Sequence, residues 1–285
     1  MAYEKKLLEW DPTGERNFES GVSHCVLYSP VKNATGDIET FTPVASGPKE
    51  PIFAGVAWNG FTGLTEKPGG AEATKLWANN GLYATMRSAE SLGVTIEAYT
   101  YPNEWKRHNG QFSPKEVEGK FGHFAVVGQQ AREAFRLSYI TQVGNDLAPS
   151  LPNQKLHMIW NATASPSERA YKTINDSPEA ITFSWEAECS DTTVSQKALA
   201  PNGKLCDMSL DLTALQKANE DTYQKLIDML HGKSDASSGN VAFLPSPDVV
   251  YDLLQGTQIT PPTITTVSAE QVAKQFNADQ NRKKN

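Results

Sequence analysis

Glu186 and Glu188 are the residues whose types and spacing come nearest to catalytic chemistry in this chain. They lie two residues apart in FSWEAEC, where apolar and polar side chains alternate as in a β-strand. On one strand face their carboxylates would lie about 6–7 Å apart, and glycosidases use carboxylates roughly 5–9.5 Å apart across a sugar. The familiar one-strand arrangement has a further acidic residue where this chain has Ala187. We therefore favour a solvated strand face, with a carbohydrate-binding or carbohydrate-hydrolysing β-sandwich protein as the alternative.

Other motifs that resemble ligand sites each lack an essential residue. Gly232-Lys233-Ser234 imitates the end of a phosphate-binding loop, but Ile227 stands where that loop needs glycine and the tripeptide follows a predicted helix. The histidines have no spacing typical of a zinc site, and no two cysteines are close in sequence. These residues are His24, His108, His123, His157 and His231, with Cys25, Cys189 and Cys206. We therefore predict no catalytic residue, cofactor or metal, and no enzymatic activity.

Composition narrows the class of protein further. The chain has 285 residues, of which 39% are hydrophobic and 21% are charged, so it can bury a sizeable core and is not a disordered chain. Its formal net charge of −7 argues against a surface built to grip DNA. The sequence has neither an apolar run of about 20 residues nor a signal-peptide core, so we expect no membrane association and folding in a cytoplasm.

Period-two alternation predicts that strands dominate the fold. On strand 154–164, Leu156, Met158, Trp160 and Ala162 are expected to share one face. The predicted strands cover residues 22–28, 52–64, 94–101, 131–143, 154–164, 169–174, 180–189 and 205–212, with a hairpin turn at 175–178 between the two strands that flank it.

Helices are few in this pattern. Residues 223–230 have helical spacing and end before Gly232, Ser246 caps a short helix over 247–254, and residues 268–277 are a further candidate. We predict a mainly β fold, with β-sandwich or barrel-forming sheets, one or two flanking short helices, a long inter-strand loop and terminal arms.

The long loop is predicted over Thr65–Gly81. It is rich in glycine at its start but carries Leu76 and Trp77. A loop of this length is uncommon within a compact domain and usually has a function. Its apolar side chains indicate that it lies against its own sheet or against a neighbouring molecule.

One segment of the chain resembles the major tail protein, or tail tube protein, of long-tailed siphophages. This segment is AGVAWNGFTGLTEKPGGAEATKLWANNGLYATMRSAESLGVTIEAYTYPNEW. The resemblance is strongest over residues 50–105 and continues through ITFSWEAECSDT and DTYQKLIDML to about residue 232. It implies a tail-tube-like β-sandwich domain over residues 1–232, with an N-terminal arm at 1–21. Residues 233–285 form a C-terminal extension with short helices.

The resemblance implies a structural virion protein of the viral tail, assembled in the host cytoplasm. Six copies form a ring, and rings stack into a hollow tube around a tape-measure protein. The tube ends on tail terminator and distal tail proteins and conducts double-stranded DNA without binding it specifically. Four strands per subunit, about 4.8 Å apart, give a barrel roughly 115 Å around and about 37 Å across, wide enough for a duplex. The tube of a phage-derived bacteriocin or other contractile-type injector is a further alternative.

Two sets of site residues follow from the resemblance. The long loop is the matching position for a bridge between subunits and rings. The expected oligomer-interface residues are Leu64, Lys67, Leu76, Trp77 and Leu82. The polar strand faces are expected to line the lumen through Glu97, Glu186 and Glu188. Six chains at −7 each carry −42 per ring (6 × −7), which repels DNA and keeps it from sticking.

Overall fold

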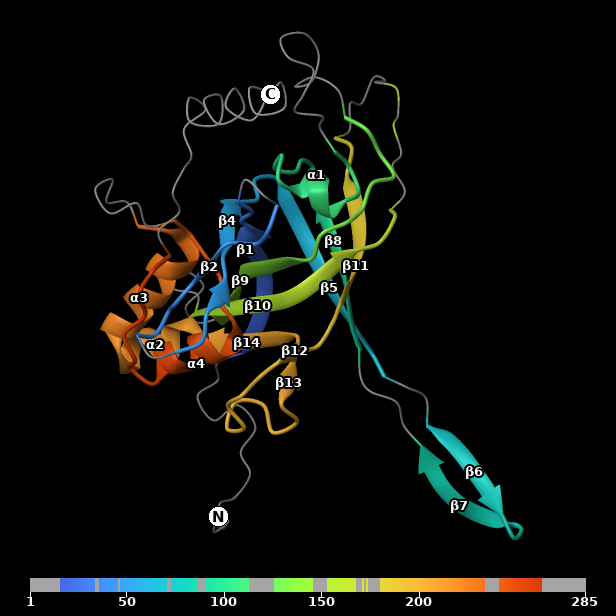
Figure 1. The fold of residues 1–285 in the computed structure, drawn as a ribbon. Coiled ribbons are helices and arrows are strands. Elements are labelled where there is room, and N and C mark those ends of the chain that lie inside the picture. The colour runs from blue at the N-terminus through green and yellow to red at the C-terminus, as the bar shows by residue number, and fades with distance from the viewer. Residues whose placement is uncertain are drawn as a thin grey trace, which may run out of the picture.

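A computed structural model shows the three layers of the molecule (Figure 1). Two sheet layers enclose a first core, and helices cover the outer face of one of them. The structure describes residues 16–33, 36–45, 47–70, 73–86, 91–112, 126–145, 153–167, 171, 173, 180–233 and 241–262. The helix predicted over 268–277 lies outside these residues, and so does most of the hairpin arm and turn predicted over 169–178. The prediction of a mainly β, sandwich-like fold is confirmed.

One antiparallel sheet contains most of the strands. Its hydrogen-bonded order is β4-β1-β9-β10-β11-β8-β5, and β14 also pairs with β10. The bounds are β1 (Asn17–Pro30), β4 (Phe53–Ala57), β5 (Phe61–Gly69), β8 (Ser91–Ala98), β9 (Phe135–Asn145), β10 (Asn153–Ala164), β11 (Phe183–Cys189) and β14 (Asp207–Asp211).

Short ladders complete the β structure. They join β2 (Thr40–Phe41) to β3 (Glu50–Pro51), β6 (Thr74–Ala78) to β7 (Gly81–Met86), and β12 (Thr192–Thr193) to β13 (Lys204–Leu205).

β10 pairs with two different strands, β14 and β11, along the edge that does not pair with β9. Its residues 155–159 pair with β14, whereas residues 162–164 pair with β11. Between these stretches the register with β9 shifts, and Asn161 has a positive φ of 51°. This β-bulge reverses the faces, because one extra residue changes which side each side chain points to. Leu156, Met158 and Trp160 share one face as predicted, and they pack toward the helices in a second core. Ala162 lies in the first core on the opposite face, so that part of the prediction is wrong.

The first core fills the space between the two sheet layers. Val94, Ile96 and Ala98 of β8 meet Phe135 and Leu137 of β9 across it. An aromatic cluster closes one end, where Trp105 of α1 (Trp105–His108) lies 4.8 Å from Trp58 and 5.4 Å from Trp185 between ring centroids.

The second core lies between β1, β9, β10 and the helices. The helices are α2 (Leu212–Ala218), α3 (Glu220–His231) and α4 (Pro247–Leu254). Asn219 caps α3 by accepting from the Thr222 amide, and Gly232 ends it at a φ of 81°, as the sequence predicted. The Tyr28 hydroxyl donates to the Leu230 carbonyl at 2.9 Å, which ties this helix to the sheet.

Residues 241–262 pack into the second core as well. Phe243 and Leu244 are buried there with Val250 and Leu253 of α4. The Gly55 amide donates to the Ala242 carbonyl at 2.7 Å, so this segment covers the outer edge of β4.

Trp160 provides a test of the second core. It is fully buried, and its Nε1 donates to the Pro245 carbonyl at 2.8 Å. We expect Trp160→Phe to lower the free energy of unfolding by about 2–4 kcal/mol, because it opens a cavity and leaves a buried carbonyl without its donor. Urea unfolding measures the change. Trp77→Phe, at an exposed position, is the control and should change stability by less than about 0.5 kcal/mol. Equal effects would contradict this account.

Candidate assembly surfaces

The acidic residues expected in the lumen share one face of the outer sheet layer. Along β11, Trp185 and Ala187 point into the first core, while Glu186 and Glu188 are exposed. Glu97 of β8 stands opposite Ser184 in the antiparallel register. The three carboxylates therefore lie on the outer side of the β5-β8-β11 layer. We call this outer side the polar face.

The polar face has the character of a solvated surface. Lys67 Nζ lies 3.4 Å from Glu186 Oε1, with side chains 56% and 70% exposed. An exposed ion pair of this kind contributes little to stability. Glu186 and Glu188 are thus exposed carboxylates on a sheet surface, as the favoured interpretation of the sequence expects.

The tryptophans bear on the carbohydrate alternative. Trp58, Trp160 and Trp185 are each at most 4% exposed, so they cannot stack on a sugar in this conformation. Trp105 is also buried. Of the tryptophans in the described residues, Trp77 alone is exposed.

The predicted loop at 65–81 is mostly regular β structure. Residues 65–69 continue β5 along β8, and β6 and β7 form a two-stranded ribbon that projects away from the sheets (Figure 1). Asn79 and Asn80 turn the ribbon with positive φ values of 50° and 60°. Asn-Asn-Gly between two alternating segments is a hairpin signal, and it was the clue available in the sequence.

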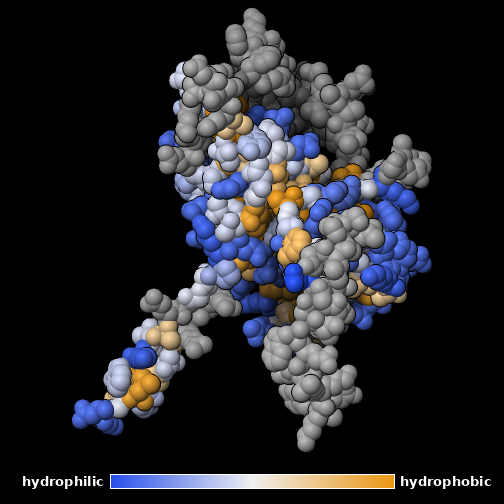
Figure 2. Space-filling model, turned by 180° about the vertical axis from the view of Figure 1, so that it is seen from behind, coloured by the Kyte–Doolittle hydropathy of each residue, from blue (hydrophilic) through white to orange (hydrophobic). Residues whose placement is uncertain are grey.

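The ribbon exposes large apolar side chains. Trp77 is 68% exposed, Leu82 51% and Tyr83 77%, and Leu76 and Met86 are also exposed. Figure 2 shows the ribbon projecting from the body of the molecule, with hydrophobic patches in orange on its surface. An isolated two-stranded hairpin is at best marginally stable in water. A protein partner that covers these side chains would therefore stabilise it.

The other two expected interface residues lie on β5 rather than on the ribbon. Leu64 is partly buried and packs against the first core, and Lys67 lies on the polar face. The structure therefore places Leu76, Trp77 and Leu82 together and separates them from Leu64 and Lys67.

A polar cluster that the sequence analysis missed joins the two sheet layers. The Tyr139 hydroxyl donates to Glu66 of β5, and its ring stacks on His157 with 4.6 Å between centroids. The Thr141 hydroxyl donates to Glu19 at 2.6 Å, and that hydrogen bond is the main reason that the pKa of Glu19 is lowered. Burial lowers the pKa of His157. These contacts join β5 to β9 and β10, from positions far apart in the sequence.

The remaining histidines and cysteines have structural surroundings. His108 Nδ1 donates to the Glu133 carbonyl at 2.8 Å, so its Nε2 accepts from the Ser29 hydroxyl at 2.7 Å. The His24 and His231 rings stack at 6.0 Å, and His123 lies outside the described residues. Cys25 and Cys189 are buried free thiols. Within the described part of the chain, no three His, Cys, Asp or Glu residues are placed to hold a metal ion.

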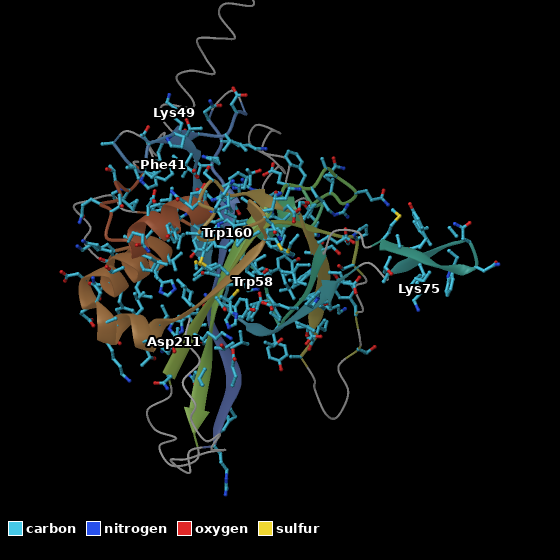
Figure 3. The ribbon with its side chains drawn as sticks, turned by 90° about the horizontal axis from the view of Figure 1, so that it is seen from below. Phe41, Lys49, Trp58, Lys75, Trp160 and Asp211 are labelled. Atoms are coloured by element: carbon cyan, nitrogen blue, oxygen red, sulfur yellow. The ribbon has the colours of Figure 1, made fainter. Side chains whose placement is uncertain are left out.

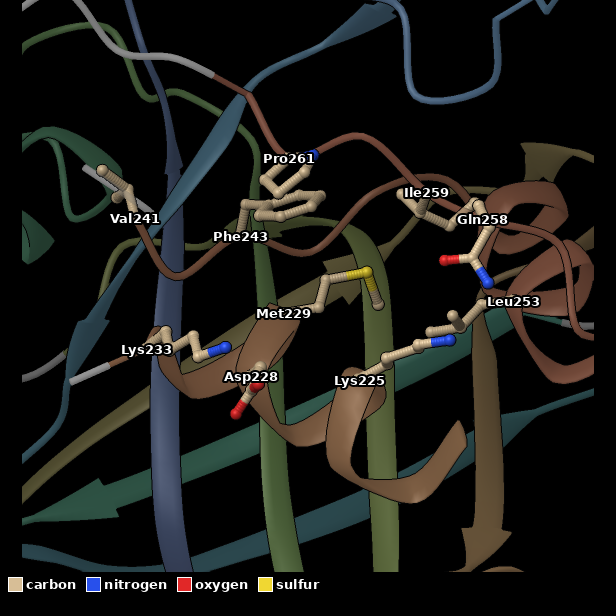
Figure 4. Close-up of a pocket in the computed structure, with 10 residues that line it drawn as sticks. All are labelled: Lys225, Asp228, Met229, Lys233, Val241, Phe243, Leu253, Gln258, Ile259 and Pro261. Carbon is tan, nitrogen blue, oxygen red and sulfur yellow. The ribbon is translucent and has the colours of Figure 1, made fainter. Parts of the chain in front are cut away.

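A pocket of about 220 Å³ opens between α3, α4 and the segment after α4 (Figure 4). Met229, Phe243 and Leu253 form its buried apolar floor. Lys225 and Lys233 lie at its exposed rim, so Lys233 of the tripeptide Gly232-Lys233-Ser234 belongs to this pocket. We call it the helical-layer pocket. No local pattern in the sequence predicts this pocket, because its walls come from three separate segments, residues 225–233, 241–243 and 253–261.

Comparison with known proteins gives no family assignment: no family model matches the chain, and no curated protein matches it. Among the helices in the described ranges, none is long and apolar enough to span a membrane. The functional argument therefore depends on the surfaces of the chain itself.

His108 makes stability depend on pH. Burial is the main reason that its pKa falls to about 4, whereas in the unfolded chain it is near 6.5. Between these values the unfolded state takes up a proton that the folded state refuses. The free energy of unfolding should therefore fall by on the order of 3 kcal/mol as the pH drops from 6.5 to 4.

Urea unfolding from pH 7.5 to pH 4 measures this loss. His108→Asn keeps a side-chain amide to donate to the Glu133 carbonyl but removes the titrating group, so its stability should change less over the same range. An unchanged slope in the variant would show that other groups cause the pH dependence.

Proposed function

We propose that this protein is a structural subunit that assembles with copies of itself into stacked rings, forming the tail tube of a phage-like particle. The observation that carries the proposal is the ribbon β6–β7, which extends beyond the sheets and exposes Leu76, Trp77 and Leu82. Apolar side chains held out in this way are typical of an interaction site. In this proposal the ribbon contacts another subunit.

The β5 edge supports lateral joining of subunits. One edge of β5 pairs with β8 along most of its length. Within the described residues, no strand pairs with its other edge. Open edges invite pairing with another chain, and joining them between identical subunits closes a ring. Edge-to-edge joining would extend the polar face from one subunit to the next.

The polar face supports a conduit role. Placed toward the lumen, Glu97, Glu186 and Glu188 would give its wall a negative charge that repels DNA phosphates. The tape-measure protein would fill the lumen before DNA passes, and terminator and distal proteins would close the tube ends. The buried tryptophans count against the carbohydrate-binding alternative. A tube of an injector particle would use the same surfaces.

Removal of the ribbon tests the proposal directly. Thr74 and Met86 face each other in the ladder, so two glycines can replace residues 75–85 and join this pair in a tight turn. We expect the variant to keep the circular dichroism and melting temperature of the parent protein but to lose tubes in negative-stain microscopy. Regular tubes from this variant would refute the role of the ribbon.

Two variants of the ribbon distinguish the effect of its apolar side chains from the effect of its charge. Trp77→Ser combined with Leu82→Ser should weaken assembly, whereas Lys75→Ser on the same ribbon should leave it nearly unchanged.

Charge reversal on the polar face tests the conduit role. Replacement of Glu97, Glu186 and Glu188 by lysine changes the charge by +6 per chain, because each substitution adds two units. Tubes of this variant should retain double-stranded DNA at low salt and release it as salt rises. Co-sedimentation with labelled DNA measures retention. The control is the same set of substitutions to glutamine, which removes charge without reversing it. Equal DNA retention by lysine and glutamine tubes would place these residues outside the lumen.

A further inference from the structure

Asparagine followed by glycine occurs four times in this chain, at residues 59–60, 80–81, 109–110 and 202–203. In such a pair the glycine nitrogen can attack the asparagine side-chain amide, because glycine has no β-carbon to shield its nitrogen. The attack requires the asparagine side chain to swing over the following peptide bond and the glycine nitrogen to be free of other contacts. The four pairs should therefore differ in reactivity according to how firmly the structure holds each of them.

The pairs at 109–110 and 202–203 are held by hydrogen bonds. Asn109 is only 5% exposed, and the Gly110 carbonyl accepts from the Gln130 amide at 3.0 Å. The Gly203 amide, which would be the attacking group, donates to the Ala200 carbonyl at 2.8 Å. Attack at either pair would first require these contacts to break.

The pair at 59–60 is exposed but packs against the chain that follows β8. The Gly60 carbonyl accepts from the Tyr99 amide at 2.8 Å, and a β-carbon on Gly60 would lie 2.6 Å from the Thr100 side chain. Trp58, just before the pair, is buried in the first core, and its Nε1 donates to the Thr100 carbonyl at 2.9 Å. These contacts fix the pair to the body of the molecule.

Asn80-Gly81 lies at the tip of the ribbon. Figure 3 labels Lys75 on the ribbon, which stands apart from the sheets, whereas Trp58 lies within the body. Asn80 and Gly81 are exposed, and none of the residues of β6 and β7 is buried. An isolated two-stranded hairpin is at best marginally stable in water, so this pair is released by local opening far more often than the other three.

We propose that Asn80 is a site of spontaneous deamidation, and that a chain converted at this position no longer assembles. In the first step the Gly81 nitrogen loses its proton and bonds to Asn80 Cγ, and the side-chain nitrogen leaves as ammonia. The product is a cyclic succinimide. Water then opens the ring at one of its two carbonyls, which gives either aspartate or isoaspartate. In isoaspartate the main chain runs through the former side-chain carbonyl.

Both products alter the ribbon, so the part of the inference that concerns assembly rests on the proposed function. Each product adds a negative charge to a ribbon in which Lys75 is the one charged residue. Isoaspartate also adds a methylene group to the backbone of a hairpin turn whose length sets the strand register. That register pairs Trp77 with Leu82, two of the apolar residues of the proposed contact.

Ageing of the full-length protein in mildly alkaline buffer tests the site. Peptide mapping by mass spectrometry measures conversion at all four pairs in one sample, and labelling by isoaspartyl methyltransferase detects the isoaspartate. We expect Asn80 to convert at least about tenfold faster than Asn59, Asn109 and Asn202, which corresponds to a modest difference in local opening free energy. A rate at any other pair that equals or exceeds the rate at Asn80 would overturn the proposal.

The same measurement in urea shows whether the fold sets this order. The four rates should converge when the chain is unfolded, because each pair has the same two residue types. An order that persists in urea would show that the neighbouring sequence sets the rates, contrary to the argument from structure.

Gly81→Ala tests the attacking atom. Gly81 does not have a positive φ, and a β-carbon there would lie 3.9 Å from the Ala78 carbonyl oxygen, an ordinary contact. The variant should therefore fold like the parent protein and convert Asn80 severalfold more slowly. An unchanged rate of conversion would contradict attack by the Gly81 nitrogen.

Asn80→Gly tests the effect on assembly. It removes the reactive amide and suits the backbone, since φ at residue 80 is 60°. The aged parent protein should lose tubes in negative-stain microscopy as its converted fraction grows, whereas the equally aged variant should keep them. Tubes that form equally well from converted and fresh chains would overturn the effect on assembly.

The outcomes separate this inference from the proposed function. If Asn80 is not the preferred site but removal of the ribbon still abolishes tubes, this inference is wrong and the proposed function stands. If the fresh parent protein forms no tubes, the proposed function itself fails, and the order of the four rates still decides whether Asn80 is the preferred site.

Discussion

The bulge at Asn161 is the constraint on which both cores depend. Before it, β10 pairs with β14 and points its large side chains at the helices; after it, the same strand pairs with β11 and its alternate residues enter the first core. One extra residue thus lets a single strand belong to both sheet layers. Without this shift Ala162 would face the helices and the first core would lose part of its floor.

The two sheet layers therefore differ in how many of their faces are covered. β1, β9 and β10 are covered on both faces, by the first core on one side and by the helices on the other. Among the described residues, the β5-β8-β11 layer is covered on one face only, so its outer face is free to be polar. The ribbon grows from the end of this half-covered layer, where the backbone can leave the sheet without disturbing either core.

The sequence predicted much of this fold, for a physical reason that also explains its failures. Residues 94–101 and 180–189 alternate cleanly and were predicted as strands, because β8 and β11 within them have one buried and one solvated face. The face predicted for β10 after Trp160 was wrong, because the left-handed backbone conformation of Asn161 interrupts the two-residue period without changing the composition. The ribbon was read as a loop because none of its side chains is buried in the described residues, which leaves no hydrophobic pattern. The polar cluster at Tyr139 and the helical-layer pocket join segments distant in sequence, and no local pattern encodes such proximity.

Residues 242–244, which we call the strap, protect one edge of the sheet within the single chain. By bonding to Phe53 and Gly55, it occupies backbone groups of β4 that would otherwise be available to any passing strand. These backbone groups of β4 are therefore already hydrogen-bonded within the folded chain. Uncontrolled edge-to-edge pairing is therefore disfavoured there, and in the proposed assembly the β5 edge would be the one that joins a neighbouring subunit.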